Sequence, residues 1–317
     1  MSQETKHGDH ESRDLDKWAS WLLYQRFAGC SPEERQRAAL LLEGIRNRIV
    51  ERARLKPGDL VLDIGAGTGL VASKAVAEVG EEGLVLAADL SLDALRQFPR
   101  SARLDRGPRV LPLACDGAFL PLRSQAIDAV VMRSVLIYVV DKAMVLAEAS
   151  RVLRPGGRLS FSEPINRDRV HNVDLSQLPT QIQAKLAEME TLRRDSHDPM
   201  LNFDAADLVR VVHAAGLTDV ETETQEVVEE YVDQQSVRGF FNRMTAPGEP
   251  TMAEVLTRHV GAAGMSLVLD AWIGTLGRGP VRFSTPALYV AATKPWPRQI
   301  PTRSRDWKDE EQPHGRS

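Results

Sequence analysis

The sequence predicts an α/β fold: a mostly parallel sheet of seven strands with helices on both faces. Two observations lead to this fold class. Short apolar stretches alternate with amphipathic helical stretches through short links, which is the pattern of a parallel sheet. The first apolar stretch also ends in a glycine-rich turn that opens a helix, as in doubly wound, Rossmann-like sheets that bind nucleotides.

Length and composition narrow the class of protein. At 317 residues, 43% hydrophobic and 26% charged, the chain suits one large globular domain with insertions or two smaller ones. A net charge of -4 gives no electrostatic footprint for nucleic acid, so no nucleic-acid partner is expected. Cys30 and Cys115 are the two cysteines and lie far apart, which indicates neither a disulfide framework nor a metal site.

The two ends of the chain are polar. Residues 1–14 and 296–317 are charged and contain too few apolar residues to order by themselves, so both are predicted to be disordered tails. The N-terminus has no apolar signal-peptide segment, and no uninterrupted apolar run approaches the roughly 20 residues that span a bilayer. A cytoplasmic protein with no membrane partner is therefore expected.

Residues 15–56 are predicted to form a helical cover that precedes the sheet. Asp16 to Phe27 carries aromatic residues along a helical stripe, and Ser31 begins a second helix with a capping-box spacing and proline at its first position. The basic stretch from Arg46 to Lys56 alternates with acids at helical spacing and is interpreted as a solvated helix face. Possible dimerisation through the aromatic helices is left open.

The stretch "DLVLDIGAGTGLVASKAV", from Asp59 to Val76, begins the sheet domain, which is predicted to cover residues 57–295. Val61 to Ile64 reads as a buried strand, and Leu70 to Val79 as the helix that follows. The glycines between them allow backbone conformations closed to other residues and let a ligand approach the main chain. Free amides at the helix N-terminus would face that ligand, which should resemble a nucleoside.

Six more strands and three further helices complete the alternation. The strands are expected at residues 84–89, 109–116, 126–134, 156–164, 218–227 and 285–294, and the helices from Ser91, over residues 141–153 and over residues 203–216. Two long segments, at about 165–202 and 228–284, do not fit the alternation. Each follows a strand at the sheet edge where ligands bind, so they are predicted to be helical lid insertions over the substrate.

The "DIGAGTG" motif from Asp63, together with acids after the second and third strands, resembles the class I S-adenosylmethionine-dependent methyltransferases. The similar branch contains ubiquinone/menaquinone-biosynthesis and other small-molecule methyltransferases, and the resemblance is strongest from Leu55 to Pro164. It implies S-adenosylmethionine as the cofactor, with Asp89 on the ribose hydroxyls and Asp116 on the adenine. A carboxylate can accept from both hydroxyls of a cis-diol, which independently suits Asp89 to the ribose.

The cofactor-binding residues expected on this basis come from the strand ends, the glycine turn and the cover. They are Asp63, Gly65, Gly67, Gly69, Asp89, Leu90, Asp116, Gly117, Arg133 and Tyr24.

Methyl transfer from a sulfonium is an in-line displacement, so alignment of the acceptor and exclusion of water are the main requirements. A hydroxyl acceptor also needs a base, for which Glu163 at the end of the fifth strand and His171 beyond it are the candidates. A salt bridge for Glu163 and a surface position for His171 are the alternatives. The expected acceptor is the oxygen or nitrogen of a small molecule or a modified peptide.

Two other functions share parts of this pattern. An NAD(P)-dependent oxidoreductase would also have the strand, turn and helix, but it expects G-x-G-x-x-G, whereas position 70 is Leu and the third glycine is Gly69. A non-catalytic binding module with the methyltransferase fold would show a broken set of cofactor residues. The set here is intact, so methyl transfer is the leading hypothesis.

Overall fold

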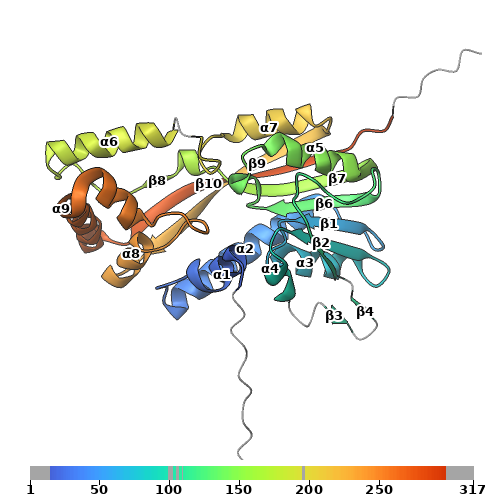
Figure 1. The fold of residues 1–317 in the computed structure, drawn as a ribbon, viewed down its shortest axis with the longest axis horizontal. Coiled ribbons are helices and arrows are strands. Elements are labelled where there is room, and N and C mark those ends of the chain that lie inside the picture. The colour runs from blue at the N-terminus through green and yellow to red at the C-terminus, as the bar shows by residue number, and fades with distance from the viewer. Residues whose placement is uncertain (1–14, 99–102, 105–106, 109, 195–196, 298–317) are drawn as a thin grey trace, which may run out of the picture.

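The computed structural model describes residues 15–98, 103–104, 107–108, 110–194 and 197–297. Both predicted tails lie outside this part of the chain, except for Trp296 and Pro297. Figure 1 shows two regions side by side: a sheet domain, and a helical lobe at the far ends of two long strands.

The predicted sheet is confirmed. Its seven main strands are β1 (Leu60–Ile64), β2 (Leu84–Asp89), β5 (Val110–Ala114), β6 (Ile127–Arg133), β7 (Leu153–Pro164), β9 (Thr218–Tyr231) and β10 (Val281–Thr293). The first five lie parallel in the order β5-β2-β1-β6-β7, then β10 pairs antiparallel with β7, and β9 pairs antiparallel with β10. A short eighth strand, β8 (Val170–His171), pairs with β10 beyond the end of β7. A separate hairpin joins β3 (Arg103–Leu104) to β4 (Gly107–Pro108).

Helices cover both faces of the sheet, as predicted. One face carries α2 (Pro32–Ala53), α3 (Leu70–Val79) and α4 (Leu92–Arg96), and the other carries α5 (Lys142–Val152) and α7 (Ala205–Ala214). The apolar strands are buried between these layers, since Val61, Leu62 and Val130 are fully enclosed. Burial on both faces explains why the parallel strands read as nearly continuous apolar runs.

The predicted lid segments form a lobe with a hydrophobic core of its own. Strands β9 and β10 extend four residues further into these segments than predicted, and α6 (Thr180–Arg194), α8 (Gln234–Phe241) and α9 (Met252–Thr275) pack around their ends. Aromatic rings fill this core, with Phe240 stacked on Trp272 at 5.5 Å between centroids. These aromatic residues of the second lid segment therefore serve mainly as core packing.

Among the described residues, the helical segment Met252–Arg278 is long and apolar enough to cross a membrane by length and composition alone. The core helices of folded proteins pass the same test. Charged residues, Glu254, Arg258 and Asp270, interrupt its apolar pattern, so the sequence did not indicate this segment as a membrane-spanning one.

The N-terminal cover consists of α1 (Lys17–Ser20), a π-helical turn (Trp21–Gln25) and α2. The predicted capping box at Ser31 is present, because the Ser31 hydroxyl accepts from the Glu34 amide and the Glu34 carboxylate accepts from the Ser31 amide. These bonds satisfy amides that would otherwise be unpaired at the start of α2.

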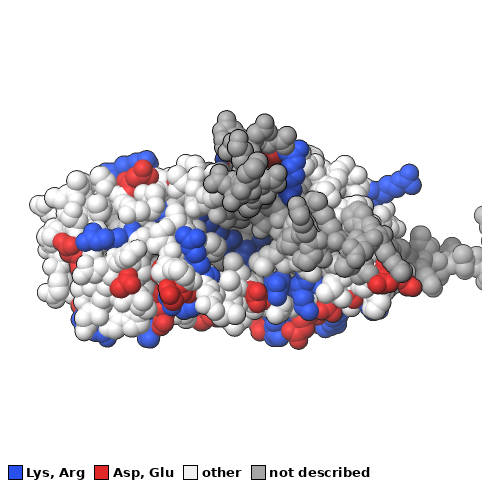
Figure 2. All heavy atoms as spheres, turned by 90° about the horizontal axis from the view of Figure 1, so that it is seen from below, with Lys and Arg blue, Asp and Glu red and all other residues white. Residues whose placement is uncertain are grey.

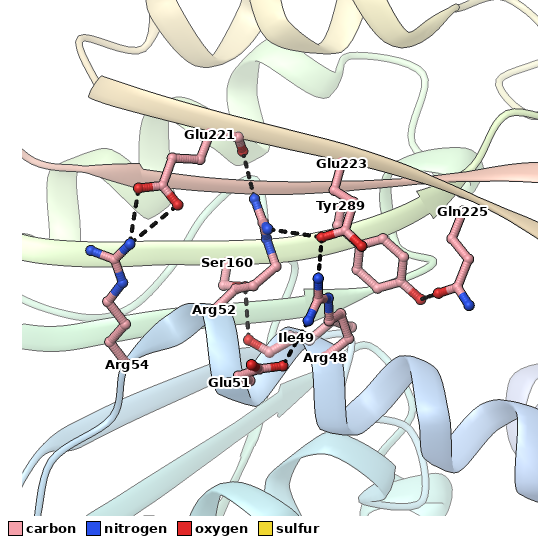
Figure 3. Close-up of polar contacts among 10 residues, drawn as sticks. All are labelled: Arg48, Ile49, Glu51, Arg52, Arg54, Ser160, Glu221, Glu223, Gln225 and Tyr289. Atoms are coloured by element: carbon pink, nitrogen blue, oxygen red, sulfur yellow. Dashed lines mark hydrogen bonds and ion pairs between the residues drawn. The ribbon is translucent and has the colours of Figure 1, made fainter.

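The basic stretch at the end of α2 was predicted to be a solvated helix face, and this prediction is wrong. Figure 3 shows that arginines of this stretch bond to glutamates of β9. The Glu223 carboxylate on β9 accepts from both Arg48 and Arg52, and Arg54 donates to Glu221 at 2.9 Å. The acidic strand β9 thus binds the basic end of α2. The sequence showed the two charge patterns but not that the fold places them together.

Candidate functional site

The glycine turn between β1 and α3 has the geometry that its sequence predicts. Gly65, Gly67 and Gly69 all have positive φ, at 68°, 53° and 91°. A Cβ at Gly65 would lie 2.4 Å from Val135, and one at Gly69 would lie 2.5 Å from the Phe98 ring. Both conformation and space therefore require glycine at these two positions, which brings the backbone close to neighbouring elements.

Two acids hold this turn. The Asp63 carboxylate is buried and accepts from the Ala72 amide of α3 at 2.9 Å, and burial raises its pKa to about 8. The Asp89 carboxylate at the end of β2 accepts from Gly67 at 2.8 Å and from Ser91 at 2.8 Å. Burial also raises the pKa of Asp89. Asp63 therefore fixes the helix behind the turn, while Asp89 fixes the middle of the turn itself.

The third predicted acid lies at the end of β5. Asp116 is exposed, and its carboxylate accepts from the Ala118 amide at 2.8 Å. At Gly117 a Cβ would lie 2.8 Å from Ile64, so this chain segment packs closely against the end of β1. Leu90, 62% exposed, extends into solvent beside Asp89. The structure thus brings the ends of β1, β2 and β5 together, with apolar and acidic groups open to a ligand.

The cover lies over the glycine turn. The Asp16 carboxylate caps α1 and accepts from the Ser91 hydroxyl at 2.7 Å, next to Asp89. The Leu22 side chain lies 3.3 Å from where a Cβ of Gly67 would stand. Leu22 thus contacts the turn, whereas Tyr24 is 68% exposed and its predicted contact with the cofactor stays a prediction.

The end of β6 carries Arg133 and an unusual turn. Ser134 has φ at 50°, a conformation that residues other than glycine seldom adopt. The Glu163 carboxylate is fully buried and accepts from the three backbone amides that follow Ser134. These are the amides of Val135, Leu136 and Ile137, at 2.8, 2.9 and 3.3 Å. These contacts make Glu163 a positioning residue for this turn, and its predicted catalytic role stays a prediction.

Burial raises the pKa of Glu163 to about 7. The folded state therefore retains a proton that the unfolded state releases between about pH 4.5 and pH 7. The resulting stabilisation is complete below pH 4.5 and is lost as the pH rises towards 7. The shift corresponds to roughly 3 kcal/mol.

We expect Glu163→Gln to remove this loss. Between pH 4.5 and pH 7.5, the free energy of unfolding of the parent protein should fall relative to that of the variant, as measured by urea denaturation. Asp63 titrates in the same direction in both proteins and cancels in the comparison. A variant that loses more stability at pH 7.5 than at pH 4.5 would show that the three amides hold the carboxylate ionised.

His171, the other candidate base, lies on β8 in the helical lobe. Its ring packs against Trp272 at 5.3 Å and Phe283 at 5.9 Å between centroids. The Nδ1 atom accepts from the Val173 amide, and burial lowers the pKa of the ring. The neutral ring then carries its proton on Nε2, and in this arrangement it offers a donor rather than a base. The structure does not bring His171 together with Asp63 and Asp89, and its catalytic role also stays a prediction.

Comparison with known proteins agrees with this geometry. The family of proteins described as "Methyltransferase domain" matches residues 61–157, which run from β1 into β7. A ubiquinone/menaquinone biosynthesis C-methyltransferase of Teredinibacter turnerae is 39% identical over 122 residues, which cover 37% of this chain and 49% of that protein. The corresponding enzyme of Hahella chejuensis is 31% identical over 176 residues, or 53% of this chain and 70% of that protein. The chain belongs to the class I S-adenosylmethionine-dependent methyltransferases.

The solved structure of the YcgJ protein of Bacillus subtilis superposes with a TM-score of 0.54 at 16% identity. The match covers 80% of this chain and 99% of that one. It supports the fold alone. The chain spans about half the length of the first curated methyltransferases that it matches.

Sequence reasoning missed several residues of this methyltransferase site. Asp16 and Leu22 come from the cover, and Val135 packs against Gly65 of the glycine turn from the segment that follows the neighbouring strand β6. Arg243 reaches the cover from the segment after α8, where its Nη2 donates to the Cys30 sulfur at 2.9 Å. No sequence pattern marks these residues, since each depends on a contact between distant segments.

Proposed function

We propose that this protein transfers the methyl group of S-adenosylmethionine to an oxygen or nitrogen of a small-molecule or modified-peptide acceptor. The main support is the pairing of Asp89 with the glycine turn. The Asp89 carboxylate at the end of β2 accepts from the Gly67 amide. Gly65 and Gly69, on either side of Gly67, have positive φ and no side chain, which lets a ligand approach the main chain closely. Family membership supplies the cofactor class.

The residues present fit this cofactor. Each Asp89 oxygen accepts one amide and keeps a lone pair, so both could receive ribose hydroxyls. The exposed Leu90 and the Asp116–Gly117 segment stand where an adenine ring would need an apolar face and an acceptor. Gly69 provides no side-chain cap for α3, and Asp63 bonds the amide of Ala72, so only the amides before Ala72 could donate to a polar ligand.

When bound, the cofactor supplies an electrophilic methyl group. The chain's task is then to align the acceptor and exclude water. The cover is suited to keeping water out of the site, because hydrogen bonds join it to both the sheet domain and the lobe. Asp16 bonds Ser91 of the sheet domain, whereas the Trp21 indole donates to the Met244 carbonyl of the lobe at 3.1 Å.

A general base is needed only for some acceptors. An amine can arrive deprotonated, whereas a hydroxyl has to lose its proton during transfer. Tyr138 lies beside the cover, and burial raises the pKa of its phenol, so it would act as a hydrogen-bond donor and not as a base. Glu163 remains the proposed base for a hydroxyl acceptor, whereas His171 could act as a base only if its Nδ1 released the Val173 amide.

Calorimetric titration with S-adenosylmethionine, S-adenosylhomocysteine and NADH, side by side, tests the proposal. We expect micromolar affinity for both sulfur nucleosides and no binding of NADH. Binding of NADH alone would favour the oxidoreductase, and binding of none by folded, ligand-free protein would favour the non-catalytic module. Methyl transfer from labelled cofactor to a panel of phenols, alcohols and amines would then identify the acceptor atom.

A further inference from the structure

Three arginines from distant parts of the sequence gather where the cover, the sheet edge and the lobe meet. Arg26 follows the π-helical turn of the cover, Arg133 ends β6, and Arg243 lies two residues after α8. Figure 2 shows Lys and Arg atoms in the recess between the lobe and the sheet domain on this face.

Contacts between neighbouring side chains connect the three. The Arg26 guanidinium lies 5.5 Å from the centroid of the Trp21 ring, and that ring packs against Tyr138, at 6.1 Å, in the turn after Arg133. On the other side, Arg243 donates to Cys30 of the cover. The charges also influence one another: burial and then the charge of Arg26 lower the pKa of Arg133 to about 10. The positively charged guanidinium groups thus lie close to one another and are largely shielded from solvent.

Hydrogen bonding in this cluster is incomplete. Within the described part of the chain, the Nε atoms of Arg133 and Arg243 are buried and have no hydrogen-bond partner, a feature that they share with the ion-paired Arg52 and Arg158. Within the described residues, no ion pair joins Arg26, Arg133 or Arg243 to a carboxylate. The arginines at the end of α2, by contrast, are paired with glutamates of β9.

The nearby acids do not neutralise the cluster. Glu163 faces Arg133, but its carboxylate oxygens are bonded to backbone amides. Glu229 on β9 interacts with Arg26 only at a distance beyond an ion pair. Buried guanidinium groups without a partner charge are costly, so an anion bound between these arginines would stabilise the arrangement.

We propose that Arg26 and Arg243 bind an anionic group, a carboxylate or a phosphate, on the methyl acceptor. This inference rests on the proposed function. The planar guanidinium fork matches both oxyanions. Arg133 lies next to Val135 and the glycine turn and would serve the carboxylate of the cofactor, which leaves the other two for the acceptor. The rings of Trp18, Trp21 and Tyr138 beside the cluster suit an aromatic body on that acceptor.

Ligand-observed NMR titrations test the proposal with three probes of similar size: benzoate, phenyl phosphate and uncharged benzyl alcohol. Each is titrated into protein saturated with S-adenosylhomocysteine. We expect at least one anion to bind at least tenfold more tightly than the alcohol, and the better anion identifies the acceptor's group as carboxylate or phosphate. Arg26→Gln and Arg243→Gln should each remove this preference, and Arg243→Lys should restore part of it.

Arg238→Gln is the matched control, since Arg238 is an exposed arginine of α8 and lies five residues before Arg243. This variant should keep the preference. Equal affinity for charged and uncharged probes in the parent protein overturns the inference, as does a preference that survives in both glutamine variants. Arg26→Gln and Arg243→Gln variants that lose affinity for S-adenosylhomocysteine but keep the anion preference would also overturn it.

Failure of the proposed function gives a different result. If the parent protein does not bind S-adenosylhomocysteine, the methyltransferase proposal fails. The anion titrations without the nucleoside still decide whether Arg26 and Arg243 form an anion site.

Discussion

Asp89→Ala is expected to weaken binding of S-adenosylhomocysteine by more than tenfold. The substitution removes both proposed acceptors for the ribose hydroxyls and also releases the Gly67 and Ser91 amides. Loss of charge-assisted hydrogen bonds worth about 1.5–3 kcal/mol corresponds to a factor of ten or more in affinity. Isothermal titration calorimetry measures the change directly.

Asp141→Ala is the matched control for this variant. The Asp141 carboxylate likewise accepts from two backbone amides, those of Ala143 and Met144, where β6 leads into α5. It should lower the melting temperature without changing the affinity for the nucleoside. Unchanged affinity in Asp89→Ala would remove Asp89 from the ribose site.

Gly65→Ala should abolish measurable nucleoside binding and destabilise the protein by roughly 2–5 kcal/mol. Two costs combine here. A φ of 68° is unfavourable for alanine by roughly 1–2 kcal/mol, and the new Cβ would stand 2.4 Å from Val135, where overpacking adds roughly 1–3 kcal/mol. Urea denaturation measures the loss of stability, and calorimetric titration measures the loss of nucleoside binding.

Two further variants separate these costs. Gly58 has a φ of 85°, and no atom lies within 4 Å of where a Cβ would stand. Gly58→Ala should therefore lose only the stability that the unfavourable φ costs. The double variant Gly65→Ala/Val135→Ala removes the overlap and should recover part of the nucleoside affinity. Equal destabilisation by Gly65→Ala and Gly58→Ala would show that Val135 moves aside at no cost.

Local signals account for what sequence analysis predicted correctly. The helix Leu70–Val79 and the strand Leu84–Asp89 were predicted with the observed ends, because glycines or charged residues stop their apolar pattern. The capping box at Ser31 follows from two residues that lie three positions apart. The acids at the strand ends could be located because parallel strands all end at one edge of the sheet.

The predictions fell short where long-range pairing decides the structure. Strands β9 and β10 extend into the lid segments because each supplies the other's hydrogen bonds from Val281↔Tyr231 onwards. The Arg48 and Glu223 side chains are 175 positions apart in the sequence, and they meet because the fold places α2 beside β9. A propensity pattern contains no information about the partner strand, so the second lid segment was predicted to start too early, at residue 228, and to end too late, at residue 284.

The sequence by itself thus determined the sheet, its glycine turn and the acids at its strand ends, since each depends on backbone conformation and residues close along the chain. The tertiary structure alone decided what faces that turn. It placed Leu22 over Gly67, bonded Glu163 to the turn after β6, and brought Arg26, Arg133 and Arg243 together with no ion-paired carboxylate in the described part of the chain. Burial and charge proximity are properties of the packed chain, and they appear only when distant segments are in contact.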